Sequence, residues 1–349
     1  MPRLIIHAGP AKTGSTAIQR GLMKEAKALR EVGIHFYCRP GPWQWALILP
    51  YRRDKLSTFL PLVLRRHFMS LEKALEWCEA EWRQFEIWIR SERPETVLIS
   101  SEHLAFGGDI PALIERLSNS FDRINVIGFA RHPVEAAVSA LEQNIRTGWD
   151  LGSLPTFTVE PSNSAKFLRS YEKTLGRDHI HINRFSRSAL HNGDVVADFF
   201  RSLCSLTGTS ITTPPEISDE NPGVCGAAVA WFLMVNEDQK IRSRSAEDFK
   251  AFFIRRKALI HQFRVSPAMA ALPRVKLSDP VLENLILHRS KSTLEWVNSN
   301  HLKYRDQFAL GKHMDRIPPD PEVRERVTTW LRGYLTPDAV DIIFREIVG

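Results

Sequence analysis

The stretch HAGPAKTGST, residues 7–16, decides how the chain begins to fold. It follows the short apolar run Leu4-Ile5-Ile6 and leads into residues 17–29, which read as a helix. The order is therefore strand, glycine-containing turn, hydroxyl pair and helix. Glycine lets a backbone turn tightly and approach an anion, and a helix N-terminus offers free N–H groups with a partial positive charge. The pattern predicts a phosphate-binding cradle between a buried strand and a helix.

The two glycines of this turn are spaced as in a nucleoside-triphosphate loop, but the lysine is displaced. Gly9 and Gly14 match the glycines of G-x-x-x-x-G-K-[ST], whereas Ser15 stands where that loop has lysine. The only lysine in the turn is Lys12. We therefore expect an anion other than a conventionally held nucleoside triphosphate. Taken alone, the stretch also fits an ordinary strand-to-helix turn in which Ser15 or Thr16 caps the helix.

Composition narrows the class of protein. The chain has 349 residues, 43% hydrophobic and 25% charged, which is typical of a globular protein. Its net charge of +7 suits an anionic cofactor or an acidic substrate. We expect no nucleic-acid partner, because there is no basic tail, zinc finger or aromatic–basic RNA signature. The oligomeric state is not indicated.

The chain shows no sign of membrane insertion or export. No apolar run approaches the roughly 20 residues needed to span a bilayer, and the first strand begins too close to Met1 for a signal peptide. The four cysteines are widely spaced, which fits reduced thiols better than disulfides or a zinc site. We expect a cytoplasmic protein without a membrane span.

Two further strands end in residues capable of chemistry. The buried run Val97-Leu98-Ile99 is followed closely by Glu102 and His103. Ligands of open α/β sheets bind at the carboxyl ends of strands, so either residue is placed to act as a general base. The alternatives are a cap or salt bridge for Glu102 and a partly buried structural histidine for His103.

The next strand, residues 124–131, ends in Arg131, and Pro133 then opens a helix over residues 134–146. Arg131 offers a guanidinium fork suited to phosphate, and Ser139 adds a hydroxyl on the following helix. The alternatives are that Arg131 pairs with a structural carboxylate and that Ser139 is a small packing residue.

These paired motifs resemble those of the sulfotransferases that use 3′-phosphoadenosine 5′-phosphosulfate (PAPS). The resemblance covers about residues 3–31 and 96–146, and weakly 165–206. It implies that Lys12, Thr13, Gly14, Ser15 and Thr16 bind the 5′-phosphosulfate and that Arg131 and Ser139 bind the 3′-phosphate. It also implies that Lys12 neutralises the leaving group and that Glu102, or else His103, is the catalytic base.

The sequence departs from that family in three respects. The glycine-rich segment that closes over the cofactor near the C-terminus of the small-molecule enzymes has no clear counterpart here. Glutamate and histidine stand side by side where the family has one base. The aromatic contact to adenine is unassigned, with Phe185 as a candidate that also fits a core role. No metal is expected.

The sequence predicts an α/β fold with a mostly parallel central sheet of about four or five strands flanked by helices, similar to a P-loop fold. We expect one sulfotransferase-like domain over residues 1–349, with a core of about 1–206 and a helical addition of about 207–349. Residues 39–45 and 147–164 read as loops. Helices are expected at about 17–29, 55–92, 110–120, 195–206, 223–240, 246–263, 279–308 and 321–347.

The predicted function is sulfuryl transfer from PAPS to a hydroxyl or amine of a small molecule or saccharide. A carbohydrate acceptor is favoured by Glu102, by Trp43 and Trp45 in the aromatic loop, and by the basic residues between 240 and 257. The tryptophans fit loop anchoring equally well, and the basic run fits a solvated helix face. One alternative is a P-loop kinase, which magnesium-dependent nucleotide binding would reveal. The other is a non-catalytic binding protein, which would turn over no cofactor.

Overall fold

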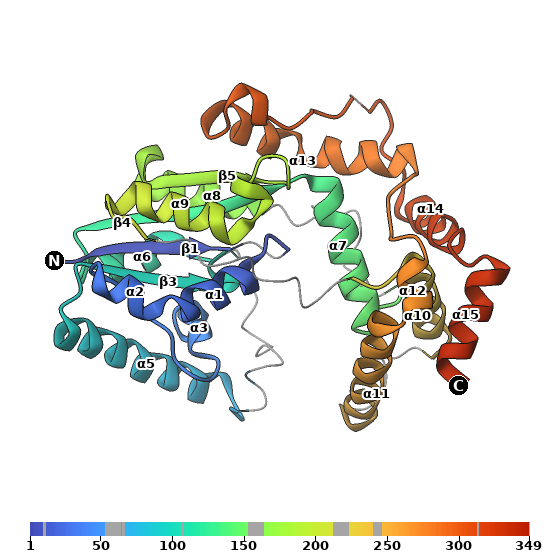
Figure 1. Cartoon of the computed structure of the whole chain (residues 1–349), viewed down its shortest axis with the longest axis horizontal. Coiled ribbons are helices and arrows are strands. Elements are labelled where there is room, and N and C mark those ends of the chain that lie inside the picture. The colour runs from blue at the N-terminus through green and yellow to red at the C-terminus, as the bar shows by residue number, and fades with distance from the viewer. Residues whose placement is uncertain are drawn as a thin grey trace. The chain divides into compact units, whose positions relative to one another are not determined.

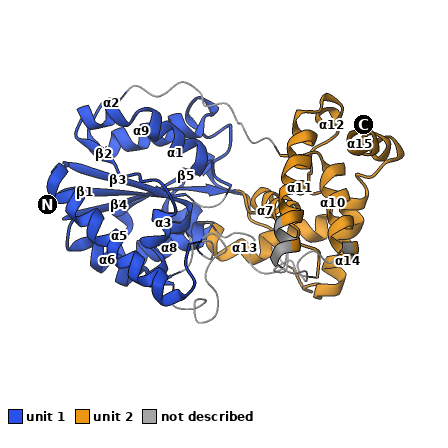
Figure 2. Ribbon diagram, turned by 90° about the horizontal axis from the view of Figure 1, so that it is seen from below, with its two compact units in different colours: residues 1–131, 164–218, 295–308 blue, residues 132–163, 219–294, 309–349 orange. Residues whose placement is uncertain are grey.

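The chain forms two compact units, each built from several segments of sequence. The computed structural model describes residues 1–9, 12–52, 64, 67–105, 108–152, 164–211, 223–239, 246–312 and 314–348. Unit 1 comprises residues 1–131, 164–218 and 295–308, and unit 2 comprises residues 132–163, 219–294 and 309–349 (Figure 2). These boundaries differ from the expected division near residue 206, and the single-domain organisation stays a prediction.

Unit 1 is built on a five-stranded sheet in the order β2-β3-β1-β4-β5 (Figure 1). All four strand pairs are parallel, which confirms the predicted fold class. The interior strands are largely apolar and buried, as expected for a sheet covered on both faces. The strands are β1 (Arg3–Ala8), β2 (Ile34–Phe36), β3 (Thr96–Ser101), β4 (Arg123–Arg131) and β5 (Ile180–Phe185).

Helices cover both faces of this sheet. Figure 2 shows α1, α2 and α9 on one face and α5, α6 and α8 on the other. The first group encloses a core in which Ile5, Ile18 and Phe199 are fully buried. The helices of unit 1 are α1 (Ser15–Lys24), α2 (Ala26–Glu31), α3 (Trp43–Ala46), α5 (Leu71–Glu92), α6 (Ile110–Ser118), α8 (Ser164–Leu175) and α9 (Val195–Thr207).

Unit 2 consists of helices around their own apolar core, which includes Phe232, Phe263, Leu282 and Leu331. α13 belongs to both units, since its final residues from Glu295 onward count with unit 1. The helices are α7 (Pro133–Arg146), α10 (Gly226–Gln239), α11 (Ala246–Val265), α12 (Pro267–Ala271), α13 (Pro280–Asn300), α14 (Asp320–Arg332) and α15 (Pro337–Val348).

Five expected elements are corrected by the structure. The helix expected at about 55–92 is α5, which begins only at Leu71, and the described residues 67–70 before it are not helical. Residues 17–29 form two helices, α1 and α2, because Glu25 leaves the helical conformation between them. Residues 321–347 likewise form two helices, since α14 ends at Arg332 and Pro337 opens α15. α13 ends at Asn300 rather than at residue 308. The supposed loop 39–45 contains the start of α3, because its prolines and glycine all precede the helix.

Candidate active site

Three neighbouring strands bring the predicted site residues of unit 1 to one edge of the sheet. β1 lies between β3 and β4, with Ala8 level with Ser101 and His7 level with Ile127. The segments that follow these strands contain Lys12 after β1 and Glu102 after β3, while Arg131 closes β4. The connection from β3 to β4 passes across β1, so this edge is a topological switch point, where α/β sheets bind ligands.

The turn after β1 has the backbone of an anion-binding nest. Lys12 has φ 70° and Gly14 has φ 77°, both in the left-handed region. Gly14 is the N-cap of α1, and no side chain caps the helix. The alternative in which Ser15 or Thr16 caps α1 is therefore wrong. Because left-handed residues turn successive N–H groups toward one concavity, and the first N–H groups of α1 have no side-chain cap, the turn is suited to an anion.

The floor of the cradle is tightly packed. A Cβ atom on Gly9 would collide with Ser15 Oγ and lie 2.8 Å from His7 Cε1, so only glycine fits there. Thr13 and Ser15 are buried, whereas Thr16 is exposed. Ser15 Oγ therefore has a fixed place under the turn, and the Thr16 hydroxyl stands open to solvent. Pro10 and Ala11 lie outside the described residues.

Arg131 connects β4 to the cradle. Its Nη1 donates a hydrogen bond to the carbonyl oxygen of Lys12 at 3.0 Å. The guanidinium carbon lies 5.5 Å from the ring centroid of Phe185, the last residue of β5. The predicted cation at this strand end thus supports the left-handed backbone of Lys12 directly. Phe185 contacts Arg131 and the partly buried edge of the core rather than lying inside it.

Glu102 is electrostatically coupled to Lys12. The side chain is exposed, yet enough protein surrounds the carboxyl that desolvation raises its pKa above the ordinary value of 4.5. The positive charge of Lys12 opposes this and lowers the pKa. A carboxylate with a raised pKa is a stronger proton acceptor, and here it is coupled to the cation of the cradle.

His103 faces a different set of neighbours. Its ring lies over Trp45 with centroids 4.1 Å apart, and the guanidinium carbon of Arg52 is 5.7 Å from the centroid of the Trp45 ring. Burial first, and then the charge of Arg52, lower the pKa of His103 to about 4. The imidazole is therefore neutral near pH 7. Trp43 is buried in the core, so of the two loop tryptophans it is Trp45 that lies beside a candidate base.

A buried histidine beneath the cradle was not predicted. His7 is completely buried, its Nδ1 is 2.7 Å from Ser100 Oγ, and its ring packs against Phe129 and Phe199. Burial lowers its pKa to about 3, so it is neutral. The one signal in the sequence is a polar residue inside an otherwise apolar strand.

Other predicted site features lie elsewhere or outside the described residues. Ser139 is on α7 in unit 2, so its joint role with Arg131 stays a prediction. Residues 153–163 of the predicted loop and 240–245 of the basic run are not described. Within that run Arg256 is buried, with its guanidinium carbon 4.2 Å from the centroid of the Phe232 ring, so the run is not a uniformly solvated face.

The described residues contain no group of three or more metal-ligating side chains arranged to hold an ion. Among the described helices, none combines the length and hydropathy needed to cross a bilayer.

Comparisons with known proteins give only structural similarities. No protein-family model matches the chain, and no curated protein matches it either. The chain resembles sulfotransferases of known structure. One, from Alicyclobacillus acidocaldarius, is 15% identical with a TM-score of 0.38, over 72% of this chain and 96% of its own. The sulfotransferase domain of the curacin biosynthetic pathway is 16% identical with a TM-score of 0.35, over 61% and 76% of the two chains.

A third similar structure is the sulfotransferase domain of the Synechococcus PCC 7002 olefin synthase. It is 16% identical with a TM-score of 0.34, over 61% of this chain and 74% of its own. All three similarities are distant, with TM-scores below 0.5.

Proposed function

We propose that this protein transfers a sulfuryl group from PAPS to a hydroxyl or amine acceptor. The observation that carries the proposal is the arrangement around Lys12. Its backbone forms the cradle, its carbonyl oxygen accepts a hydrogen bond from Arg131, and its charge lowers the pKa of Glu102. One lysine is thus coupled to an anion cradle, to a guanidinium and to a candidate base.

The residues present fit the phosphate groups of such a donor. The N–H groups of Thr13, Gly14, Ser15 and Thr16 would bind the 5′-phosphate, at a helix start that no side chain caps. Arg131, together with Ser139, would bind the 3′-phosphate, because guanidinium forks match phosphate oxygens. When bound, PAPS supplies an activated sulfuryl group on a phosphate leaving group.

A residue of this chain would assist each step of the transfer. Glu102 accepts the proton of the acceptor hydroxyl or amine as its oxygen or nitrogen forms a bond to sulfur. The bond between sulfur and the bridging phosphate oxygen breaks, and its electron pair stays on that oxygen. Lys12 stabilises the negative charge that develops on this oxygen, and so it assists departure of the leaving group electrostatically. His103, neutral and packed against Trp45, is the alternate base.

A carbohydrate is the acceptor class we favour, within the broader set of small molecules and saccharides. Trp45 and Arg52 lie close to His103, and His103 directly follows the proposed base Glu102 in the sequence. An aromatic ring and a guanidinium suit a polyhydroxylated, acidic acceptor. A cytoplasmic location also remains part of the proposal.

The donor is tested by calorimetry with the full chain. We expect 3′-phosphoadenosine 5′-phosphate to bind without metal, and ATP with magnesium to bind weakly. Preferential binding of ATP with magnesium would contradict the proposal and would indicate a kinase. If 3′-phosphoadenosine 5′-phosphate binds tightly but PAPS is not turned over with any hydroxyl or amine acceptor, the chain is a non-catalytic binding protein.

The role of Arg131 has a sharper test of its own. Arg131→Ala should weaken binding of 3′-phosphoadenosine 5′-phosphate about tenfold more than binding of AMP, which lacks the 3′-phosphate. Arg123→Ala, at the opposite end of β4, is the matched control and should change neither affinity. Equal weakening of both ligands by Arg131→Ala would mean that Arg131 supports the cradle without contacting the 3′ position.

A further inference from the structure

α3 meets the end of β3 with two consecutive side chains. Gln44 Oε1 accepts a hydrogen bond from Ser101 Oγ at 3.1 Å. The ring of Trp45 packs against His103, with centroids 4.1 Å apart. Ser101 and His103 are the residues on either side of Glu102 in the sequence. A single turn of helix thus contacts both neighbours of the proposed base.

The far side of α3 is anchored in the core. Trp43 is 3% exposed and Ala46 is fully buried. Residues three apart share one face of a helix, so these two side chains point into the core together. The indole N–H of Trp82 on α5 also donates to the carbonyl oxygen of Ala46 at 3.1 Å. Gln44 and Trp45, between the two anchors, remain partly exposed at the end of the strand.

The hydrogen bonds of Ser101 determine which way the Gln44 amide is turned. The backbone N–H of His103 donates to Ser101 Oγ at 3.1 Å, so the hydroxyl hydrogen is directed to Gln44. An acceptor is needed there, which assigns the amide oxygen to this contact and leaves both hydrogens on Nε2. Within the described part of the chain, no residue accepts a hydrogen bond from that nitrogen. Gln44 therefore presents two unused donors at the end of β3.

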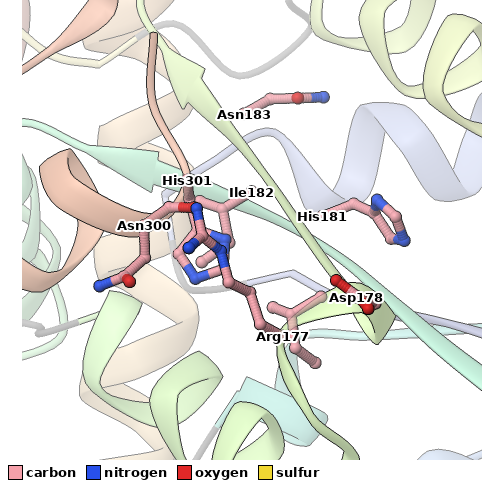
Figure 3. Close-up of a pocket in the computed structure, with 8 residues that line it drawn as sticks. Arg177, Asp178, His181, Ile182, Asn183, Asn300 and His301 are labelled. Atoms are coloured by element: carbon pink, nitrogen blue, oxygen red, sulfur yellow. The ribbon is translucent and has the colours of Figure 1, made fainter. Parts of the chain in front are cut away.

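The polar pocket along β5 contrasts with this arrangement. Figure 3 shows His301 on one side of the strand and His181 on the other. His301 Nε2 is already 2.5 Å from a carboxylate oxygen of Glu172, and the amide of Asn125 is 3.3 Å from His181 Nε2. These imidazoles diverge and each has a partner. The Gln44 donors instead lie at the carboxyl edge of the sheet, where α/β proteins bind ligands.

We propose that Gln44 binds the acceptor, by donating a hydrogen bond from Nε2 to an oxygen next to the reacting hydroxyl. The inference rests on the proposed sulfuryl transfer and narrows its acceptor to a vicinal diol, which carries hydroxyls on two neighbouring carbons, as a saccharide ring does. Glu102 takes the proton of one hydroxyl, Gln44 donates to the other, and Trp45 contacts the carbon skeleton.

The spacing of the two side chains suits neighbouring oxygens of one small molecule. Consecutive residues have Cα atoms about 3.8 Å apart, and the Gln44 amide is bonded to the residue directly before Glu102. An acceptor with a single hydroxyl displaces water from the amide and gives its donor no partner. Because an unpaired donor costs free energy, the site discriminates against such an acceptor.

Matched alcohols test this preference on the full chain. trans-Cyclohexane-1,2-diol and cyclohexanol differ only in the second hydroxyl. With PAPS as donor, kcat/KM per hydroxyl should be about fivefold to tenfold higher for the diol, the value of one hydrogen bond. Saturation-transfer NMR with 3′-phosphoadenosine 5′-phosphate bound should show the same preference in binding, because this hydrogen bond does not depend on turnover.

Gln44→Glu distinguishes acceptor binding from a purely structural role. Its carboxylate still accepts the hydrogen bond of Ser101 but has no hydrogen to donate. The ratio of the two kcat/KM values should therefore fall to about one, and any effect of the new charge on Glu102 cancels in that ratio. Gln84→Glu, the same change at an exposed position of α5, should keep the preference for the diol.

The outcomes separate this inference from the proposed function. A protein that binds 3′-phosphoadenosine 5′-phosphate but does not discriminate between the two alcohols overturns the role of Gln44 alone. A diol preference that survives Gln44→Glu also overturns it and leaves Gln44 as a structural partner of Ser101. A protein that does not bind 3′-phosphoadenosine 5′-phosphate overturns the proposed function together with this inference.

Discussion

Lys12 combines a backbone role and a side-chain role at one position. Its φ of 70° is unusual for a residue with a Cβ atom, and Arg131 binds its carbonyl oxygen. Its ammonium group at the same time lowers the pKa of Glu102. Strained backbone of this kind is concentrated at functional sites, where surrounding contacts maintain it.

Lys12→Ala and Lys12→Gly separate these two roles. Both variants lack the ammonium group, so turnover should fall about 100- to 1000-fold in each. Glycine accepts the left-handed conformation, so Lys12→Gly should be more stable to urea than Lys12→Ala by about 1 kcal/mol. Equal unfolding free energies would mean that the Lys12 backbone stores no strain.

Glu102→Gln should lower activity without lowering stability. Loss of the base should reduce turnover about 100- to 10,000-fold. Because the carboxyl pKa is raised in the folded state, ionised Glu102 destabilises the fold at any pH above that pKa. The effect vanishes below the pKa that the carboxyl has in the unfolded chain. The variant should therefore unfold at or above the wild-type temperature at pH 7, with the difference shrinking as the pH falls toward 4.5.

The matched control for this prediction is Glu95→Gln, an exposed residue just before β3 at the opposite end of the strand. It should change neither turnover nor the unfolding temperature. If His103→Gln abolishes turnover while Glu102→Gln does not, the proposed base moves to His103.

The site was predictable where an apolar run stops at a polar residue. Lys12, Glu102 and Arg131 follow buried strands, and parallel strands present their carboxyl ends at one edge. The neighbours that tune these residues were not predictable. The sequence named Trp45 as a possible acceptor contact, but its position over His103 and the place of Arg52 beside it come from tertiary packing, which no sequence pattern encodes.

At the scale of elements, the turn into α1 depends on one glycine. Gly14 combines φ 77° with close packing, because an added Cβ would lie 2.7 Å from Val195 Cγ1 on α9. Gly208, after α9, has nearly the same backbone (φ 73°) and nothing within 4 Å of an added Cβ. The two positions therefore differ in packing and share their conformation.

Gly14→Ala should cost more stability than Gly208→Ala. Both substitutions place a Cβ on a left-handed residue, at about 1–2 kcal/mol. Only Gly14→Ala also forces a contact between α1 and α9, which adds about 1–3 kcal/mol. Urea unfolding of the two variants measures the difference, and equal losses would show that Val195 moves aside freely.

Long, periodic elements were predicted well and short ones were not. β1, β3, β4 and α7 were visible as buried runs or amphipathic patterns. α3 was missed because four residues are too few to show a period, and its flanking prolines indicated a loop. The segments that form α1 and α2, and α14 and α15, were correctly predicted to be helical. The break within each depends on one or two residues, while the helical pattern of apolar residues continues across it.

At the scale of the whole molecule, unit 1 is completed by a segment from far along the chain. Residues 295–308 return to it after the long excursion through unit 2. Trp296 and His301 then contact Glu172, and Arg184 Nη1 donates to the carbonyl oxygens of Asp306 and Gln307 at 3.0 Å. The core expected at residues 1–206 lacks this segment.

Two substitutions within this segment measure its contribution. Trp296 is 7% exposed, so Trp296→Ala should cost about 3–5 kcal/mol through lost packing and an unpaired Glu172 oxygen. Tyr304 is 91% exposed, and Tyr304→Ala should change stability by less than about 0.5 kcal/mol. Thermal and urea unfolding give both values. A small effect of Trp296→Ala would mean that the segment is dispensable for unit 1.

The late return of residues 295–308 has a consequence for biosynthesis. Ninety residues separate position 218, where the second segment of unit 1 ends, from position 308, where the unit is complete. A ribosome that adds about 5–20 residues per second needs roughly 5 to 20 s to cover them. During that interval the nascent sheet has every strand but lacks Trp296 and His301, which contact Glu172, and residues 306–307, which accept hydrogen bonds from Arg184 on β5. We expect the growing chain to be most open to chaperones and to misassembly in this window, when its terminal strand is formed and still uncovered.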